Sequence, residues 1–293
     1  MHRILVLGAG KIGRMIARLL HDTGDYAVTV GDESAPALER LREQTPVETR
    51  IMDARQAGAL RAALDGQTAV VSALTYDCNI EVARAAVELG LSYFDLTEDV
   101  ATTRAIVALE PQLRAGQILA PQCGLAPGFI SIVAAHLASQ FEELDSVRMR
   151  VGALPTYPSN MLKYNLTWST NGLINEYCNL CETIHDGRLL EVLPLEGLEE
   201  FSLDGVRYEA FHTSGGMGTL CHSLTGRVRE LNYKTIRYPG HRELMQFLLG
   251  ELRLRERREL LREILEAAVP FTVQDVVVTF CTVAGQRHGQ FVQ

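Results

Sequence analysis

The run Arg3-Ile-Leu-Val-Leu7, followed directly by Gly8-Ala-Gly-Lys-Ile-Gly13, decides the fold of the amino-terminal half of this chain. The first five residues form an apolar, β-prone run of the kind that fills a buried parallel strand. After the glycines, apolar residues recur at helix spacing, at Ile12, Met15, Ile16, Leu19 and Leu20. The glycine motif is therefore predicted to form the turn between a strand and a helix.

There is a physical reason for glycine at each of three positions of this motif. Gly8 permits a tight turn, Gly10 lets the backbone come close to a pyrophosphate, and Gly13 lets the helix pack on the strand. The start of the helix, with Lys11 and Ile12, adds N–H donors and the positive end of the helix dipole. The motif in this context predicts a dinucleotide-binding site.

Asp32 indicates which dinucleotide is bound. A second strand, Ala27 to Val30, ends in Gly31-Asp32, and Asp32 stands nineteen residues after Gly13, close to the roughly 20 expected for the acid that binds the adenosine ribose. A carboxylate there accepts hydrogen bonds from the 2′-OH and repels a 2′-phosphate. Because no Arg or Lys follows within the next few residues, we expect NAD, with NADP less favoured. The alternative is that Asp32 only caps a turn before a helix near Ser34.

Two further strand ends are predicted beside the cofactor, because ligands of open parallel sheets bind at the carboxyl ends of strands. Asp53 follows a strand over residues 47–52 and either approaches the adenine or caps the next helix. Ala73 and Leu74 stand at the end of a strand over residues 68–73.

The pattern of strands and helices divides the chain in two. Helices over 35–44, 55–64 and 79–89 alternate with strands up to one over 117–122, which predicts a doubly wound parallel sheet. After Leu144, apolar and polar residues alternate as in antiparallel strands buried on one face. A helix is expected over 242–268 and a turn over 284–286. We therefore expect an α/β protein, with a Rossmann-type domain over 1–125 and a second α+β domain on a mostly antiparallel sheet over 126–293.

Composition argues against several other classes of protein. The 293 residues include 28 Lys and Arg against 36 Asp and Glu, a net charge of −8, which disfavours nucleic acid as a partner. No apolar run approaches the roughly 20 residues of a membrane helix, so no membrane partner is expected. Six cysteines without regular spacing are typical of reduced thiols in the cytoplasm. One Cys178-x-x-Cys181 pair, with His185 beyond it, is too weak a signal for zinc, and no metal is expected.

Two further blocks give the chain a family resemblance. One is Tyr164-Asn-Leu-Thr-Trp168-Ser-Thr-Asn-Gly172-Leu-Ile-Asn-Glu176-Tyr177. The other runs from Phe211-His-Thr-Ser-Gly-Gly-Met217 to Tyr233-Lys-Thr-Ile-Arg237-Tyr-Pro-Gly-His241. Together with the glycine motif, they resemble the saccharopine dehydrogenase-like oxidoreductases and, within these, the lysine 6-dehydrogenases. The segment Gly124-Leu-Ala-Pro127-Gly128 is similar to this family's crossing out of the nucleotide domain, which adds Pro127 to the expected cofactor contacts.

The resemblance implies oxidation of a carbon that bears an amine, in a small amino-acid substrate, with hydride transfer to the nicotinamide. Such a site needs a cation for the substrate carboxylate and a group that takes the amine proton. Arg237 is the first candidate for the carboxylate because its planar fork binds in a bidentate way. The other expected substrate contacts are Thr213, Ser214, Lys234 and Tyr238, and the candidates for proton transfer are Asp95, Glu98, Lys163 and His241.

Several of these assignments carry a structural alternative. Strand alternation puts Lys234 and Tyr238 on one face and Arg237 on the other, so the three share a pocket only if a bulge intervenes near Pro239. Glu98 is equally well explained as a first-turn helix acid, and Lys163 can act as a base only if burial lowers its pKa.

Two rival functions remain open. One is a saccharopine or carboxynorspermidine dehydrogenase or reductase that uses NADP(H), and the other is a non-catalytic protein that senses NAD. Members of the family usually run further than Gln293, so we expect this chain to lack their closing carboxyl-terminal segment. The family also suggests a homodimer.

Overall fold

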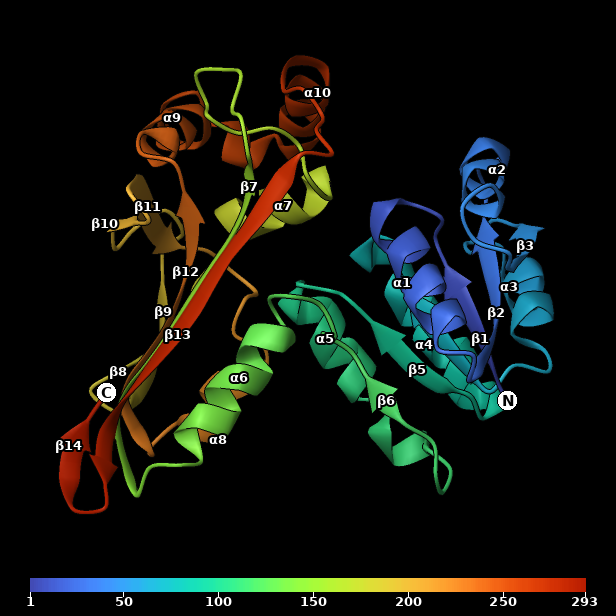
Figure 1. Ribbon diagram of the computed structural model, residues 1–293, viewed down its shortest axis with the longest axis horizontal. Helices are drawn as coiled ribbons and strands as arrows, with labels where there is room; N and C mark the ends of the chain where they lie inside the picture. The colour runs from blue at the N-terminus through green and yellow to red at the C-terminus, as the bar shows by residue number, and fades with distance from the viewer. The chain divides into compact units, whose positions relative to one another are not determined.

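The computed structural model describes residues 1–293 and divides into two compact units, Met1–Gly124 and Leu125–Gln293 (Figure 1). Each unit is built around hydrophobic clusters of its own. No helix is both long enough and apolar enough to span a bilayer.

The first unit is an open parallel sheet of six strands in the order β3-β2-β1-β4-β5-β6. Every neighbouring pair is parallel, and Leu7 of β1 lies opposite both Gly31 of β2 and Ser72 of β4. The chain reverses its direction of travel across the sheet between β1 and β4, the switch point at which such sheets bind ligands. The strands are β1 (His2–Leu7), β2 (Tyr26–Asp32), β3 (Glu48–Ile51), β4 (Ala69–Ser72), β5 (Ser92–Asp95) and β6 (Leu119–Ala120).

Helices cover both faces of this sheet because β1 is apolar on both sides. Ile4 and Val6 pack into one cluster with α1 and α2, whereas Leu5 and Leu7 pack into another with α3, α4 and α5. The predicted doubly wound parallel sheet is confirmed. The helices are α1 (Lys11–Asp22), α2 (Ala35–Arg42), α3 (Ala57–Leu64), α4 (Tyr76–Leu89) and α5 (Val100–Val107), followed by a 3-10 turn, η1 (Glu110–Gln112).

The second unit is a mixed sheet in the order β10-β11-β12-β7-β13-β14, with β8 paired to β12 and β9 paired to β8. Only the β12–β7 pair is parallel, so the expectation of a mostly antiparallel sheet is confirmed. The long strands β7 and β13 run side by side (Figure 1). The strands are β7 (Glu143–Pro155), β8 (Cys181–His185), β9 (Arg188–Val192), β10 (Glu199–Leu203), β11 (Val206–His212), β12 (Val228–Arg237), β13 (Asp275–Arg287) and β14 (Gln290–Val292).

Helices pack on two parts of this sheet. α6 and α8 contribute Ile130, Ala134 and Leu220 to one cluster, and α7 and α10 contribute Leu173 and Leu261 to another. The helices are α6 (Phe129–Ala138), α7 (Thr170–Cys178), α8 (Leu220–Leu224), α9 (His241–Gln246) and α10 (Arg258–Ala268), with short π and 3-10 turns at η2 (Phe247–Glu251) and η3 (Leu254–Glu256).

Two local predictions were wrong. The helix expected over 242–268 is broken between α9 and α10, where Arg253 takes a left-handed conformation with φ +52°. The turn expected over 284–286 lies instead at His288 and Gly289, because β13 continues through an irregularity at Ala284 and Gly285. The spacing of charged and apolar residues indicates neither the helix break at Arg253 nor the continuation of β13.

Candidate functional site

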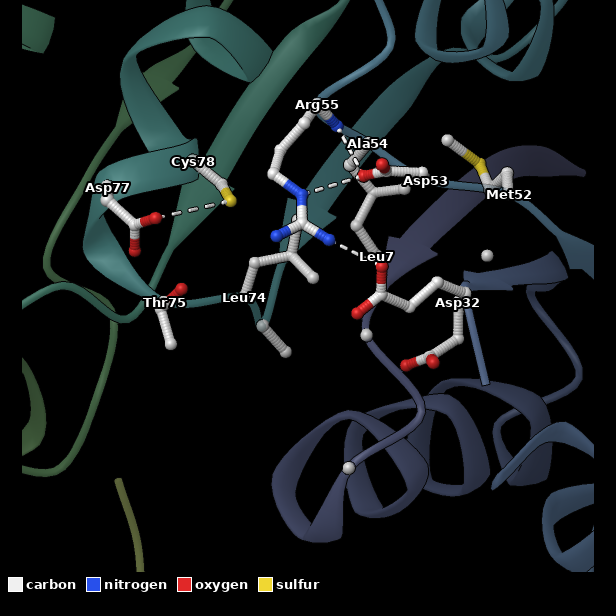
Figure 2. Close-up of a pocket in the computed structure, with 15 residues that line it drawn as sticks. Leu7, Asp32, Met52, Asp53, Ala54, Arg55, Leu74, Thr75, Asp77 and Cys78 are labelled. Carbon is white, nitrogen blue, oxygen red and sulfur yellow. Dashed lines mark hydrogen bonds and ion pairs between the residues drawn. The ribbon is translucent and has the colours of Figure 1, made fainter. Parts of the chain in front are cut away.

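A cavity of about 320 Å³ opens in the first unit at the carboxyl ends of β1, β2 and β4. Its walls are the glycine loop, the ends of these strands, the segment after β3 and the start of α4 (Figure 2). The lining residues are Leu7, Gly8, Gly10, Gly31, Asp32, Glu33, Met52, Asp53, Ala54, Arg55, Ala73, Leu74, Thr75, Asp77 and Cys78.

The glycine loop has the shape that a pyrophosphate requires. A Cβ on Gly13 would lie 1.9 Å from the Gly8 carbonyl oxygen, and a Cβ on Gly8, at φ +99°, would lie 2.8 Å from the Ala73 carbonyl oxygen. These two positions therefore hold the loop against α1 and β4. A Cβ on Gly10 would meet nothing within 4 Å, so it would project into open space. Gly10 is also the N-cap of α1 and offers no side-chain acceptor, which leaves the first-turn N–H groups for an anion.

Asp32 is fixed at the end of β2, on the rim of the cavity. Its Oδ2 accepts a hydrogen bond from the Ala9 amide at 2.6 Å, and its Oδ1 accepts one from the Ser34 amide at 2.7 Å. A carboxylate has about four lone-pair positions, so a ribose hydroxyl can still donate to it. Asp32 therefore both supports the turn before α2 and faces the cavity.

The other predicted cofactor contacts differ in where they lie relative to the cavity. Ala73 and Leu74 line the cavity, and so does Asp53. Lys11 and Ile12 form the first turn of α1 without lining the cavity. Pro127 belongs to the second unit.

Arg55 supplies a guanidinium on the cavity wall that the sequence pattern did not indicate. Asp53 Oδ1 accepts from both the amide and Nε of Arg55, each at 2.9 Å, and Arg55 Nη2 lies 2.5 Å from Glu33 Oε2. Hydrogen bonds from Arg55 hold the pKa of Asp53 below its ordinary value. Arg55 follows β3, whereas the motif places a cation for a 2′-phosphate just after β2. The spacing of a motif cannot show that two separate loops meet.

Asp95 takes a structural position, and its predicted catalytic role stays a prediction. Its side chain is buried at the end of β5. Oδ1 accepts from the amides of Thr97 and Gln122, both at 2.9 Å, and Oδ2 accepts from the Tyr93 hydroxyl at 2.7 Å. Burial raises the pKa of Asp95 in spite of these bonds. A carboxylate enclosed in this way joins β5 to the segments after β5 and β6.

Arg237 is likewise enclosed, in the second unit. It is 1% exposed, its Nε donates to the Tyr177 hydroxyl at 2.8 Å, and its Nη1 donates to the Ile236 carbonyl at 2.8 Å. Its Nη2 lies 4.0 Å from Glu176 Oε2, and its Cζ lies 5.1 Å from the centre of the Tyr164 ring. Aromatic rings cover the guanidinium, so no open carboxylate site surrounds Arg237 within the second unit, and its contact with a substrate carboxylate stays a prediction.

His241 continues the same buried network. Its Nε2 lies 3.0 Å from the Tyr177 hydroxyl, and its Nδ1 lies 2.8 Å from the Leu162 carbonyl oxygen. The carbonyl can only accept, so Nδ1 carries the hydrogen and Nε2 accepts from Tyr177. Burial and the nearby Arg237 lower the pKa of His241 to about 3. This histidine is therefore a buried, neutral imidazole, and its role as a base stays a prediction.

The remaining predicted residues of the second unit take structural positions. Lys234 is buried and donates to the Gly197 carbonyl and to Glu199 Oε1, both at 2.6 Å. Thr213 Oγ1 and Thr235 Oγ1 are 2.6 Å apart, and the Tyr238 hydroxyl donates to the Pro155 carbonyl at 2.9 Å. These contacts separate Lys234 and Tyr238 from Arg237.

Three other candidates differ in exposure. Lys163 is exposed and donates to the Pro239 carbonyl at 2.7 Å, so it lacks the burial that its predicted role required. Ser214 is buried, and its amide donates to the Glu176 carbonyl at 2.9 Å. Glu98 is half-buried just after β5 in the first unit. The predicted substrate residues therefore do not form one pocket within either unit.

Possible metal ligands gather at one exposed place only in the described chain. Ligand atoms of His185, Asp186 and Glu230 lie within 4.8 Å of one another at the β8–β9 turn. Arg229 Nη1 lies 3.1 Å from Glu230 Oε1, so a positive charge already occupies this position. Cys178 and Cys181 are buried free thiols.

A doubly wound sheet with a glycine loop and an acid at the end of its second strand defines a pyridine-nucleotide-binding protein of the Rossmann type. Comparison with known families then makes the assignment specific. The saccharopine dehydrogenase NADP binding domain matches residues 4–125, and the saccharopine dehydrogenase C-terminal domain matches residues 124–280. The chain therefore belongs to the saccharopine dehydrogenase family of oxidoreductases.

Individual relatives are distant. The saccharopine dehydrogenase [NADP(+), L-glutamate-forming] of Schizosaccharomyces pombe is 23% identical over 199 residues, which are 66% of this chain and 44% of that protein. The apo saccharopine dehydrogenase (L-Glu forming) of Saccharomyces cerevisiae has a similar fold, with a TM-score of 0.69 at 21% identity over 85% of this chain and 58% of that one. A myo-inositol dehydrogenase from Corynebacterium glutamicum matches more weakly, with a TM-score of 0.46 at 16% identity over 81% of this chain and 69% of that one. The chain thus spans about half the length of the saccharopine dehydrogenases that it matches.

Proposed function

We propose that this chain is an NAD-dependent oxidoreductase that acts on the carbon–nitrogen bond of an amino acid. The observation that carries this proposal is the cavity between the glycine loop and Asp32, in a chain of the saccharopine dehydrogenase family. The bound nicotinamide supplies the hydride acceptor or donor. The chain supplies the pyrophosphate site at the start of α1 and the ribose acceptor at Asp32.

The charge of the cavity wall supports NAD as the cofactor. Four carboxylates, of Asp32, Glu33, Asp53 and Asp77, face one guanidinium, of Arg55, which leaves a formal charge of −3. A 2′-phosphate would add about two further negative charges at pH 7, next to the carboxylate that reads the 2′-OH. The matching family domain and the fission-yeast relative carry NADP in their names, so NADP(H) remains the second candidate.

The cations of the second unit favour a substrate with few carboxylates, such as lysine in a lysine 6-dehydrogenase reaction. Arg150 and Lys234 are both paired with Glu199, and Arg237 is buried beside Tyr177. Saccharopine carries several carboxylates and needs several available cations. It is nevertheless the second candidate substrate, because the relatives named above are glutamate-forming saccharopine dehydrogenases.

The test combines binding with turnover. Purified protein would be titrated with NADH and NADPH by fluorescence, and reduction of NAD and NADP would be followed with L-lysine and with saccharopine. We expect tighter binding of NADH and turnover with lysine and NAD. Turnover with saccharopine and NADP alone would support the second candidates. Tight NADH binding with no turnover of any amine would favour the NAD-sensing alternative.

A further inference from the structure

The only cation that lines the nucleotide cavity is held by two carboxylates. Arg55 makes one hydrogen bond to Glu33 and two to Asp53, and Figure 2 shows its side chain beside Asp53 with Asp77 and Cys78 opposite. The pair of carboxylates comes from two loops, since Glu33 follows β2 and Asp53 follows β3. Both loops end at the same edge of the sheet, where the adenosine ribose is expected.

The arrangement is accessible from solvent, so it can exchange partners. The side chains of Arg55 and Glu33 are 62% and 63% exposed, and that of Asp53 is 27% exposed. Exposed ion pairs are individually weak, worth less than a tenfold change in an equilibrium. A 2′-phosphate is the kind of ligand that Arg binds through paired hydrogen bonds. Arg55 therefore has the right chemistry for NADP, but its nearest partners are carboxylates of the same cavity.

We propose that Glu33 and Asp53 are selectivity residues that exclude NADP by occupying Arg55. This inference rests on the proposed function, because it assumes that the cavity binds the adenosine end of a pyridine nucleotide. In NAD the ribose presents a hydroxyl to Asp32, and the ion pairs of Arg55 stay intact. A 2′-phosphate has to compete with two carboxylates for Arg55 and then lies close to those carboxylates and to Asp32. Selectivity for NAD thus depends on Asp32, Glu33 and Asp53 together with the paired Arg55, and not on Asp32 alone.

The experiment removes the two negative charges and keeps the cation. In Glu33→Gln with Asp53→Asn, we expect the ratio of the NADPH and NADH dissociation constants to fall roughly tenfold, measured by fluorescence titration at low ionic strength. When Arg55→Ala is added to this double variant, we expect most of the fall in this ratio to be lost. The ratio is the readout, and not NADH affinity alone, because Asp53 and Arg55 line the cavity that would hold either nucleotide.

A matched control removes two carboxylates elsewhere on the same unit. Asp22 and Glu88 are exposed, each pairs with one arginine, and they lie at the far ends of α1 and α4 from the cavity. Asp22→Asn with Glu88→Gln should leave the ratio unchanged. If the test variant proves unstable in a melting experiment, Glu33→Gln alone provides the test, with a shift of about threefold.

The outcomes separate the two proposals. Wild-type protein that binds NADH, together with a double variant whose ratio is unchanged, overturns the selectivity role and leaves the proposed function standing. Equal shifts in the test and control variants also overturn it, because they indicate a general charge effect. Wild-type protein that binds NADPH more tightly contradicts both the selectivity role and the NAD preference. Binding of neither nucleotide overturns both proposals.

Discussion

Gly10 and Gly13 stand in one motif, yet only Gly13 is required by the packing of the protein itself. Gly13 is a packing position, since any Cβ there would overlap the Gly8 carbonyl. Gly10 has ordinary backbone angles, with φ −67°, and open space around it. A side chain at Gly10 therefore suits the protein alone and conflicts only with a bound pyrophosphate.

This difference predicts separate effects of two alanine substitutions. Gly10→Ala should weaken NADH binding at least tenfold and change the melting temperature little. Gly13→Ala should weaken binding and also lower stability by about 1–3 kcal/mol, because the loop or α1 must shift. Fluorescence titration and thermal melting of both variants provide the measurement. A Gly13→Ala protein with wild-type stability would show that the loop is looser than this structure indicates.

At the scale of single residues, the sequence predicted contacts that depend on local spacing and missed those that depend on tertiary contacts. Gly8, Gly10 and Asp32 line the cavity, and their roles follow from one strand-turn-helix unit. Arg55 reaches the cavity from another loop, so no linear pattern revealed it. Arg237 lies in a block that resembles the family, but the rings of Tyr164 and Tyr177 that bury it come from separate segments.

At the scale of elements, one carboxylate joins three strands of the second sheet. Glu199 of β10 binds Arg150 of β7 through both oxygens, at 2.8 and 2.9 Å, and accepts from Lys234 of β12. Burial alone would raise the pKa of Glu199, but hydrogen bonds from Arg150 and Lys234 outweigh it and leave the pKa below its ordinary value. Arg150 and Lys234 are 2% and 7% exposed, so both depend on this partner.

We therefore expect Glu199→Gln to destabilise the second unit by about 2 kcal/mol. Breaking a fully buried ion pair costs about 3–5 kcal/mol, and the value is smaller here because the side chain of Glu199 is 41% exposed. The neighbour Glu200 provides a control, since it is 58% exposed and lies 3.9 Å from Arg207. Glu200→Gln should change the free energy of unfolding by less than about 0.5 kcal/mol. The free energy of unfolding is measured in urea. An equal decrease in the two variants would contradict this role for Glu199.

Element types were more predictable than element ends. The period of apolar residues predicted the parallel sheet of the first unit and the antiparallel strands of the second. A strand buried on both faces is apolar throughout, whereas a strand buried on one face alternates apolar and polar residues. The break at Arg253 was not predictable, since the flanking residues Glu251 to Glu263 favour one continuous helix. The left-handed residue that interrupts it has an ordinary side chain for a helix.

At the scale of the whole molecule, we expect nucleotide to change the stability of the first unit and pH to change that of the second. The nucleotide cavity lies in the first unit, whereas the second unit holds His241 and His212, whose pKa values burial lowers to about 3 and about 4. Both folded pKa values lie below the ordinary 6.5. As the pH falls below 6.5, the unfolded chain gains protons that the folded unit does not, so stability is lost towards lower pH. For His241 alone this loss is about 2 kcal/mol at pH 5.

Calorimetry is therefore expected to show two transitions that move independently. NADH at about 100 times its dissociation constant should stabilise the first unit by about 2.7 kcal/mol and leave the second transition in place. Lowering the pH from 7 to 5 should lower the second transition by several degrees. In His241→Gln the second transition should lie lower at pH 7 and depend less on pH, because the buried neutral imidazole is gone. A single transition that shifts as a whole with NADH would show that the two units unfold as one.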